Sequence, residues 1–257
     1  MSTGAINQYF DVAQVVLYLF WIFFAGLVYY LHRENKREGY PLEADNQSSR
    51  LVIQGWPPVP EPKTFKLRNG EVRYAPGPNS KKEPLPPAVQ TSVSNGSPLV
   101  PTGANPMLDN VGPGSWSNRT DTPDITLDDT PRIVPLRVAT DHDVARQDPD
   151  PRGMQVIGAD DKVGGVVRDL WVDRSEAIFR YLEVEVAGSG RRVLLPMNFS
   201  RVTHRHVFVK SILADQFANV PGTRHPDLVT LLEEERITAY YGAGTLYATP
   251  TRQDPLI

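Results

Sequence analysis

One apolar run dominates the hydrophobic pattern near the beginning of the chain. Residues 12–31 read VAQVVLYLFWIFFAGLVYYL, and Gln14 is the only strongly polar residue in this run. Twenty residues in an α-helix extend about 30 Å, the thickness of the hydrocarbon core of a bilayer. A buried soluble helix and a cleaved signal peptide are the alternatives. Residues 1–11 contain no Lys or Arg and the run ends in bulky residues, so the pattern predicts a retained transmembrane helix.

The charges flanking this run predict its orientation. Basic residues follow the run and none precedes it. Because Lys and Arg near a span stay on the cytoplasmic side, residues 1–11 are expected in the periplasm and residues 32–257 in the cytoplasm. Trp21 lies near mid-span, where its indole N–H suits a neighbouring protein, a pigment or lipid carbonyls. The residues predicted to contact lipids or partner proteins at the cytoplasmic interface are Tyr29, Tyr30, Arg33, Lys36, Arg37 and Tyr40.

Proline interrupts the hydrophobic pattern between residues 41 and 135, which hold 17 of the 24 prolines. Proline lacks an amide donor, so long helices and central strands are not expected there. Disorder is one reading of such composition. Large apolar side chains nevertheless recur, which favours residues 32–135 as an extended cytoplasmic segment that docks on partner proteins. These side chains are Trp56, Phe65, Leu67, Tyr74, Leu85, Val89, Leu99, Met107, Leu108 and Trp116.

From Met154 onward, short Val/Ile/Leu runs alternate with turn signals, which predicts a small β-barrel or sandwich. In residues 182–186, LEVEV, the leucine and valines should face a core while Glu183 and Glu185 face water or a partner. Gly164 and Gly165 inside a strand pattern predict a bulge or sharp bend.

A short helix is expected in HPDLVTLLEEERITAYYG, residues 225–242. Asp227 is the predicted N-cap, with an apolar stripe at Leu228, Leu231 and Leu232, and residues 233–235, EEE, are expected to be solvated. The predicted fold class is a single N-terminal transmembrane α-helix followed by a cytoplasmic β-rich domain, residues 136–257, with a short C-terminal helix.

Composition narrows the function classes. A formal net charge of −3 argues against a nucleic-acid partner, and the absence of cysteine excludes disulfides, thiolate metal sites and thiol nucleophiles. His204 and His206 have the spacing of a metal pair, but THRH between two Val-rich runs is more simply a hairpin turn. The GAG of YYGAGTLY lacks the context of a dinucleotide site. We therefore predict no metal site and no catalytic residues, and a membrane-anchored enzyme is the least favoured reading.

A series of short blocks resembles one family over nearly the whole chain. In order they are FWIFFAGLVYYL, HRENKREGYPLE, PKTFKL, PLVPTGANPM, VGPGSW, RIVPLRVA, DPDPRGM, DLWVDRSE, RYLEVEVAG, LLPM, FANVP, LLEEERITAYY and LYATP. Together they are similar to the H subunit of the purple-bacterial photosynthetic reaction centre. The resemblance implies one transmembrane helix and a globular domain of the PRC-barrel type, in the intracytoplasmic photosynthetic membrane.

The resemblance also implies partners. The H subunit caps the L and M subunits, which hold bacteriochlorophyll, bacteriopheophytin, carotenoid, quinones and a non-haem iron, and it binds none of these cofactors itself. A cytochrome subunit, a light-harvesting antenna ring and membrane lipids are further candidate partners. The competing reading is a membrane-anchored PRC-barrel adaptor without photosynthetic partners.

The family's task implies particular residues, because reduction of the secondary quinone consumes protons from the cytoplasm. Asp173 and Glu176 of DLWVDRSE occupy positions that line the proton entry route in the family. The alternative is that Asp173 starts a turn and Glu176 is a surface charge. Where well-studied members carry a His-x-His pair, this chain has Asp128, Asp129 and Thr130. Asp124, Asp128 and Asp129 are therefore the predicted surface proton acceptors, and the entry point stays open.

Overall fold

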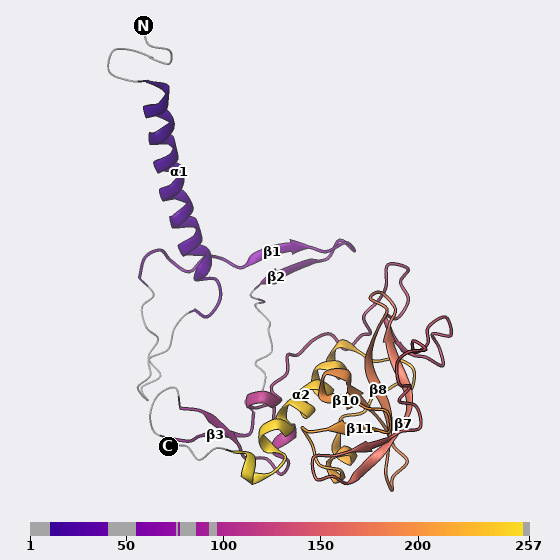
Figure 1. Ribbon diagram of the computed structural model, residues 1–257. Coiled ribbons are helices and arrows are strands. Elements are labelled where there is room, and N and C mark those ends of the chain that lie inside the picture. Colours follow the sequence, from indigo (N-terminus) through magenta and orange to yellow (C-terminus); the bar gives the residue numbers. More distant parts are fainter. Residues whose placement is uncertain (1–10, 41–54, 76, 78–85, 93–96, 254–257) are drawn as a thin grey trace. The chain divides into compact units, whose positions relative to one another are not determined.

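The computed structural model describes residues 11–40, 55–75, 77, 86–92 and 97–253 (Figure 1). The chain divides into two compact units, Met1–Pro84 and Leu85–Ile257. The predicted domain boundaries at residues 11, 31 and 135 mark functional segments and stay predictions. The predicted fold class is confirmed: an apolar N-terminal helix, then a β-rich domain with a C-terminal helix.

The first unit contains the apolar helix α1, Val12–Asn35. Asp11 caps it, since its carboxylate accepts a hydrogen bond of 2.7 Å from the Gln14 N–H. The helix is long and apolar enough to span a bilayer, and none of its residues is buried within the unit. It extends past residue 31, where the predicted span ends, because the polar residues 32–35 continue the same hydrogen-bonded helix.

Short antiparallel hairpins occupy the proline-rich stretch. In the first unit, β1, Lys63–Lys66, pairs with β2, Val72–Ala75, and all eight of these residues are exposed. In the second unit, β3, Ala88–Gln90, pairs with β4, Leu99–Pro101. Within the described residues of this stretch the elements are short, which agrees with the proline content.

A single curved sheet forms the framework of the second unit. Its strands run in the order β10-β11-β6-β7-β8-β9, and β5 also pairs with β7. The β11–β6 pair is parallel and the other pairs are antiparallel. The strand bounds are β5 Ile133–Pro135, β6 Gln155–Ile157, β7 Val163–Asp173, β8 Ile178–Val186, β9 Arg192–Pro196, β10 Ser200–Val202 and β11 His206–Val209.

The predicted bulge is present. Val156 pairs with Gly165 and Ile157 with Val163, so Gly164 is the extra residue in β7. A Cβ at Gly164 would meet the Phe217 ring at 2.6 Å, and one at Gly165 would meet the Glu185 carbonyl oxygen at 2.4 Å. Only glycine lets the bent strand approach its neighbours this closely.

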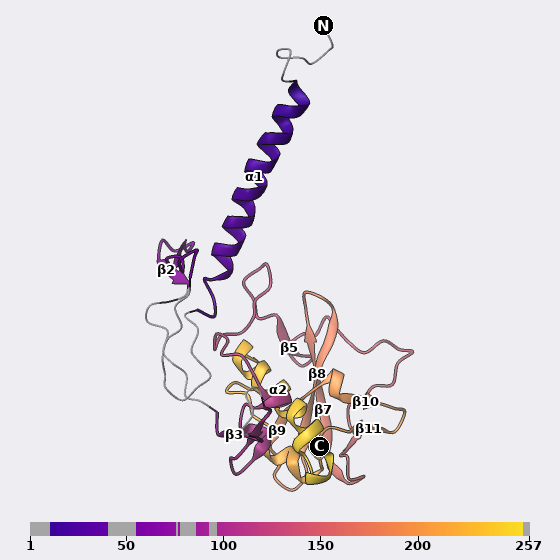
Figure 2. The ribbon, with the colours of Figure 1, turned by 90° about the vertical axis from the view of Figure 1, so that its left-hand side faces the viewer.

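The helix α2, Leu231–Tyr247, lies against the sheet (Figures 1 and 2). It contributes Ile237, Tyr240 and Tyr241 to the core that the sheet's valines and leucines build. The predicted N-cap, Asp227, is wrong. Thr230 is the N-cap, because its hydroxyl accepts from the Glu233 N–H at 3.2 Å while the Glu233 carboxylate accepts from the Thr230 N–H at 2.9 Å.

The expected orientation of Glu183 is also wrong. Leu182, Val184 and Val186 face the core as predicted, but Glu183 is buried as well. Its carboxylate accepts from Arg137 at 2.7 Å, from Arg192 at 2.8 Å and from the Trp171 indole N–H at 3.0 Å. Two guanidinium groups compensate the charge of this desolvated carboxylate. Arginine side chains therefore cover a strand position that the alternating pattern predicts to face water.

Short 3₁₀ turns attach the preceding segment to α2. They are η1, Pro106–Leu108, and η2, Gly112–Gly114, and both contact α2. Three further turns are η3, Met197–Phe199, η4, Asp215–Asn219, and η5, Pro250–Arg252. Of the large apolar residues predicted to dock in pockets, Met107 is buried in this unit and Trp116 stacks on Arg236, with 4.7 Å between the ring centroid and the guanidinium carbon. The other large apolar side chains predicted to dock are exposed wherever the structure describes them. Leu85 lies outside the described residues.

We predict that Gly244→Ala destabilises the second unit by about 1–3 kcal/mol. The added Cβ would meet the Ser211 carbonyl oxygen and the Ile212 Cγ2, each at 2.5 Å, where α2 packs on the barrel. Urea unfolding of the full chain in mild detergent, followed by tryptophan fluorescence, measures the change. Thr245→Ala, one residue along on the exposed side of α2, is the control. An equal unfolding midpoint for Gly244→Ala and the wild type would contradict close packing at this helix.

Candidate functional site

Asp173 ends β7 and begins the turn into β8. Its Oδ1 accepts hydrogen bonds from the backbone N–H groups of Ser175 at 3.0 Å and Glu176 at 3.2 Å. This is the local geometry in which an Asp side chain stabilises a turn. Asp173 therefore does start a turn, as the alternative prediction has it. Its side chain also takes part in a cluster of charged groups.

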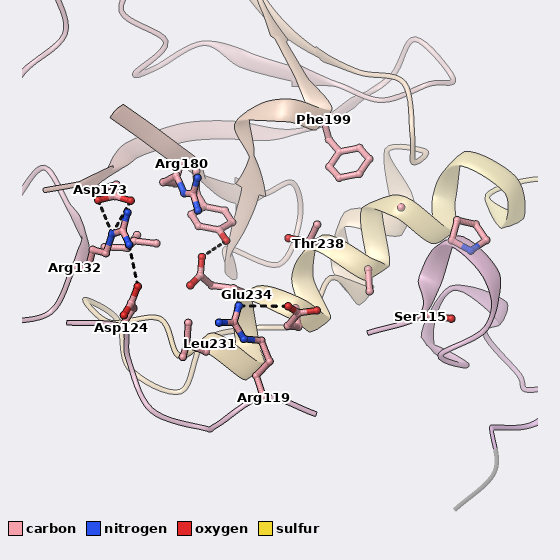
Figure 3. A pocket seen from close by; sticks show the side chains of 16 residues that line it. Ser115, Arg119, Asp124, Arg132, Asp173, Arg180, Phe199, Leu231, Glu234 and Thr238 are labelled. Carbon is pink, nitrogen blue, oxygen red and sulfur yellow. Dashed lines mark hydrogen bonds and ion pairs between the residues drawn. The ribbon is translucent and has the colours of Figure 1, made fainter. Parts of the chain in front are cut away.

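Arg132, immediately before β5, gathers three carboxylates. Its Nε donates to Asp173 Oδ1 and Oδ2 at 2.9 and 3.0 Å. One terminal nitrogen donates to Asp124 Oδ2 at 3.3 Å and the other to Glu176 Oε1 at 2.5 Å. Figure 3 shows Arg132 between Asp124 and Asp173. We call these four residues the Arg132 cluster, and it carries three negative charges against one positive charge when all its members are ionised.

The antiparallel pairing of β5 with β7 creates this cluster. Ile133, next to Arg132, lies opposite Asp173, so the register places the guanidinium beside the carboxylate. Asp124 is brought close by a small hairpin, in which Ile125 bridges to Pro131. Four residues spread over 53 positions of the chain, from 124 to 176, therefore meet at one end of the sheet.

The members differ in exposure. The Asp173 side chain is fully buried, whereas 53% of the Glu176 side chain and 39% of the Asp124 side chain are exposed. Burial raises the pKa of Asp173, but the hydrogen bonds from Arg132 and from two backbone N–H groups outweigh burial, so its pKa lies below the usual range. The hydrogen bond to Asp173 raises the pKa of Arg132 despite partial desolvation. Asp173 is therefore ionised at neutral pH, with solvated carboxylates beside it.

A cavity of about 510 Å³ adjoins the cluster and contains a different kind of carboxyl group. Arg132, Asp124, Asp173 and Glu234 all line it (Figure 3). The Tyr181 hydroxyl donates to Glu234 Oε2 at 2.6 Å. Burial raises the pKa of Glu234 more than this hydrogen bond lowers it. One cavity therefore holds a carboxylate that stays ionised and a carboxyl group that binds its proton more tightly than an exposed glutamate.

The expectation that residues 233–235 are solvated is wrong for two of them. Glu233 is buried in the capping box of α2, and Glu234 lies in the cavity. Glu235 lies 3.6 Å from Arg119 across an ion pair. A run of three glutamates gives no indication of which ones a helix turns inward, and the caps and packing of α2 decide it.

Asp128 and Asp129 do not join the cluster through any contact that the structure describes. They lie on the exposed turn of the small hairpin, where Thr126 N–H donates to the Thr130 carbonyl oxygen at 2.8 Å. Asp129 has a positive φ of 57°, which suits an Asp in a tight turn. Of the five predicted proton-transfer residues, the structure brings together Asp124, Asp173 and Glu176.

The residues predicted at the membrane interface divide into two sets. Lys36 is buried, with its Nζ donating to the Pro57 carbonyl oxygen at 2.8 Å and lying 5.8 Å from the centre of the Tyr40 ring. Arg37 forms a two-bond pair with Glu34, at 2.8 and 3.1 Å.

The other set faces outward. Tyr30 and Arg33 are exposed, and Tyr29 packs against Trp56 with 5.1 Å between ring centroids. A role of these residues at a membrane interface stays a prediction, whereas Lys36 and Arg37 bind within the first unit.

Sequence reasoning did not identify Arg132 or Glu234, and no short motif marks either residue. His204 lies in the β10–β11 turn, as predicted, whereas His206 begins β11. Within the part of the chain that the structure describes, no group of three or more His, Cys, Asp or Glu side chains has the arrangement of a metal site.

Comparison with known protein families gives two matches. Residues 4–138, just over half of the 257 residues, match the family described as photosynthetic reaction centre, H-chain N-terminal region. Residues 143–216 match the PRC-barrel domain. The first match includes Asp124 and Arg132, and the second includes Asp173 and Glu176, so the Arg132 cluster joins residues from both matched regions.

We predict that Asp173→Asn lowers the free energy of unfolding at pH 7 by about 3 kcal/mol, because it leaves Arg132 without its buried counter-charge. The pKa of Asp173 is lower in the folded chain than in the unfolded chain. Its ionised form therefore stabilises the fold above the unfolded pKa, about 4, and this stabilisation is lost as the pH falls through the folded pKa. The difference between wild type and variant should thus shrink below about pH 4.

Urea unfolding of the full chain in detergent at several pH values measures this difference. Asp128→Asn, on the exposed turn, is the matched control and should change little at any pH. A difference between wild type and Asp173→Asn that does not depend on pH would contradict the role of the ion pair.

Proposed function

Because this chain belongs to the H-chain family of the photosynthetic reaction centre, we propose that it caps the L and M subunits on the cytoplasmic side, stabilises them and conducts protons to the secondary quinone. Members of this family are non-catalytic subunits associated with a membrane, and the one apolar helix near the N-terminus fits a single-pass protein. The pigments, quinones and iron are assigned to the partner subunits. A membrane-anchored PRC-barrel adaptor without photosynthetic partners is disfavoured, because the H-chain match covers residues 4–138.

The observation that carries the proton-conducting role is the Arg132 cluster beside a cavity. A proton route from water needs exposed acceptors, a path for water and an inner group whose pKa is closer to neutral. Glu176 and Asp124 are exposed acceptors, and the cavity of about 510 Å³ is large enough for several waters. Glu234 supplies an inner carboxyl group with a raised pKa.

Asp173 takes a different part in this proposal from the exposed carboxylates. Its buried, ionised carboxylate holds Arg132 in place and contributes fixed negative charge to the lining of the cavity. Fixed negative charge attracts protons and other cations. Glu176 and Asp124 then exchange protons with water, while Asp128 and Asp129 add charge on the adjacent exposed turn.

The capping role is supported by the apolar groups that neither unit covers. Phe65 and Tyr74 lie on opposite faces of the β1–β2 hairpin, since Phe65 pairs with Arg73 and Tyr74 with Thr64, and both rings are about half exposed. An isolated two-stranded hairpin is marginally stable in water. We propose that the L and M subunits cover both faces, and that residues 32–135 form the docking segment. Contacts with a cytochrome subunit, an antenna ring or lipids belong to the same proposal.

We predict that Asp173→Asn combined with Glu176→Gln slows the second, proton-coupled electron transfer to the quinone by about tenfold or more. Primary charge separation should be unchanged, because it takes place among the pigments of the partner subunits. Flash-induced absorption changes of the purified complex measure both steps.

Asp150→Asn, an exposed residue outside the cluster, is the control and should leave both steps at wild-type rates. Unaltered quinone kinetics in the double variant would remove the assigned roles of Asp173 and Glu176. Loss of the complex during purification would instead show that the variant fails to assemble, and Glu176→Gln alone then tests the role of the exposed acceptor.

The proposed topology has a direct test, since the chain contains no cysteine. Lys162→Cys places a thiol at a position where 78% of the side chain is exposed. If the barrel is cytoplasmic and residues 1–11 are periplasmic, a membrane-impermeant maleimide should label this thiol in inside-out vesicles. The same reagent should not label the thiol in right-side-out cells. Labelling in intact cells would reverse the proposed orientation.

A further inference from the structure

The charge distribution of the barrel is uneven. Between Glu185 and Asp215, residues 186–214 contain five Lys or Arg residues and no Asp or Glu, in a chain with 30 acidic and 27 basic residues. Within this stretch Arg192 binds Glu183, and elsewhere in the described barrel Arg137, Arg152 and Arg168 also bind carboxylates. Arg201, Arg205 and Lys210 form no ion pair among the contacts the structure describes. A region whose cations form no described ion pair therefore lies around the edge hairpin β10–β11.

The hairpin places two of these cations, Arg201 and Lys210, on one face. Val207 and Val209 point into the core, so Phe208 and Lys210 alternate to the outer face. Arg201 pairs with Phe208 across the two strands and therefore lies on the same face. Within the part of the chain that the structure describes, β10 is the terminal strand of the sheet and pairs with β11 alone.

Arg252 adds a fixed positive charge to this face. One terminal nitrogen donates to the carbonyl oxygens of Ser211 and Gly244, at 2.6 and 2.5 Å, and the other donates to the Lys210 carbonyl oxygen at 2.9 Å. Carbonyl groups orient the guanidinium but do not neutralise it. The result is a preorganised cation that costs no side-chain entropy when an anion arrives.

Two adjoining hollows are built on these residues. Their volumes are about 570 and 620 Å³, and Arg201, Phe208, Lys210 and Arg252 line both of them. We call the two hollows together the β10–β11 groove. Among the described residues that line the hollows, Asp161 is the one carboxylate, in the first hollow, against three cations. The net charge of the lining is therefore positive.

We propose that the β10–β11 groove binds a phosphate-bearing anion. A phosphate group carries up to two negative charges and several acceptor oxygens, which suits three cations that surround a hollow from two strands and a C-terminal turn. A single carboxylate would satisfy fewer of them. The half-exposed Phe208 supplies an apolar surface for the organic part of such a ligand. The phosphate could belong to a soluble compound or to a phospholipid headgroup, and this inference is independent of the proton-conducting role.

The first arm of the test uses pyrophosphate as the probe. Pyrophosphate is titrated into the full chain in maltoside micelles, in a buffer without phosphate, and the heat of binding is measured. We expect saturable binding that Lys210→Gln weakens by about tenfold and that added salt weakens further. Arg146→Gln removes the same charge from an exposed residue outside the groove and should leave the affinity unchanged.

The second arm uses the same chain in nanodiscs with and without phosphatidylglycerol. The rate at which an amine reagent modifies Lys210 is followed by mass spectrometry. Slower modification in phosphatidylglycerol discs, without binding of pyrophosphate, assigns the groove to a lipid headgroup. Binding of pyrophosphate in micelles assigns it to a soluble phosphate compound.

Three results would overturn the proposal. The first is neither heat of binding nor protection of Lys210. The second is an equal loss of affinity in Lys210→Gln and Arg146→Gln, which would mean that only overall charge matters. The third is that Lys210→Gln and Arg201→Gln both keep the wild-type affinity for pyrophosphate. Because the residues of the groove lie on the surface, both variants should fold, which their circular dichroism spectra check.

Discussion

Two carboxylates of the sheet, those of Asp173 and Glu183, are buried and each needs a positive partner, and this requirement connects the segments of the second unit. A desolvated carboxylate is costly unless it is paired and hydrogen-bonded. Asp173 meets the requirement with Arg132 and two backbone N–H groups, and Glu183 meets it with Arg137, Arg192 and Trp171. Each pair ties a segment that precedes the barrel, or begins it, to a central strand. The charged pairs therefore hold together parts of the chain that are far apart in sequence.

The same requirement produces the features on which a proton route would depend. Arg132 has five N–H donors in a planar fork, so after binding Asp173 it can still hold two more carboxylates at the surface. The side chain of Glu234, which is half-buried, has Tyr181 as its only hydrogen-bond partner within the described contacts, and no arginine binds it there. Its pKa rises for that reason, while that of Asp173 falls. The same cavity is thus lined by Asp173, whose pKa is lowered, and by Glu234, whose pKa is raised. The two differ because only Asp173 is paired with an arginine.

The barrel and the preceding segment differ in how completely they bury their apolar groups. The sheet and α2 enclose a continuous core. In the first unit, by contrast, the side chains of Phe65 and Tyr74 are about half exposed and that of Trp56 is mostly exposed. Exposed aromatic groups beside a membrane-spanning helix are typical of surfaces that other chains cover. Membership of the H-chain family gives this incompleteness a reason, since such a chain functions as one part of a larger complex.

The local patterns of the sequence were sufficient for part of this picture. Length and hydropathy predicted α1, alternation predicted the core side of β8, paired glycines predicted the bulge in β7, and the order of short blocks predicted the family. Each of these predictions depends on neighbouring residues or on the order of short blocks. None of them requires knowing which distant residues are in contact. The block order also pointed to Asp173 and Glu176, but not to the residue that joins them.

Contacts between distant segments could not be read from the chain in this way. Arg132 meets Asp173 only because β5 pairs with β7 in one register, and a slip of one residue would turn its side chain to the other face. Glu183 reads as a solvent-facing strand position, yet Arg137 and Arg192 cover it. Glu234 becomes an inner carboxyl group only because Thr230 begins α2 and packing turns that position toward Tyr181. The sequence by itself determined the elements and the family, whereas the tertiary structure decided which charges are buried and paired, because burial and pairing depend on chains of contacts between residues far apart in sequence.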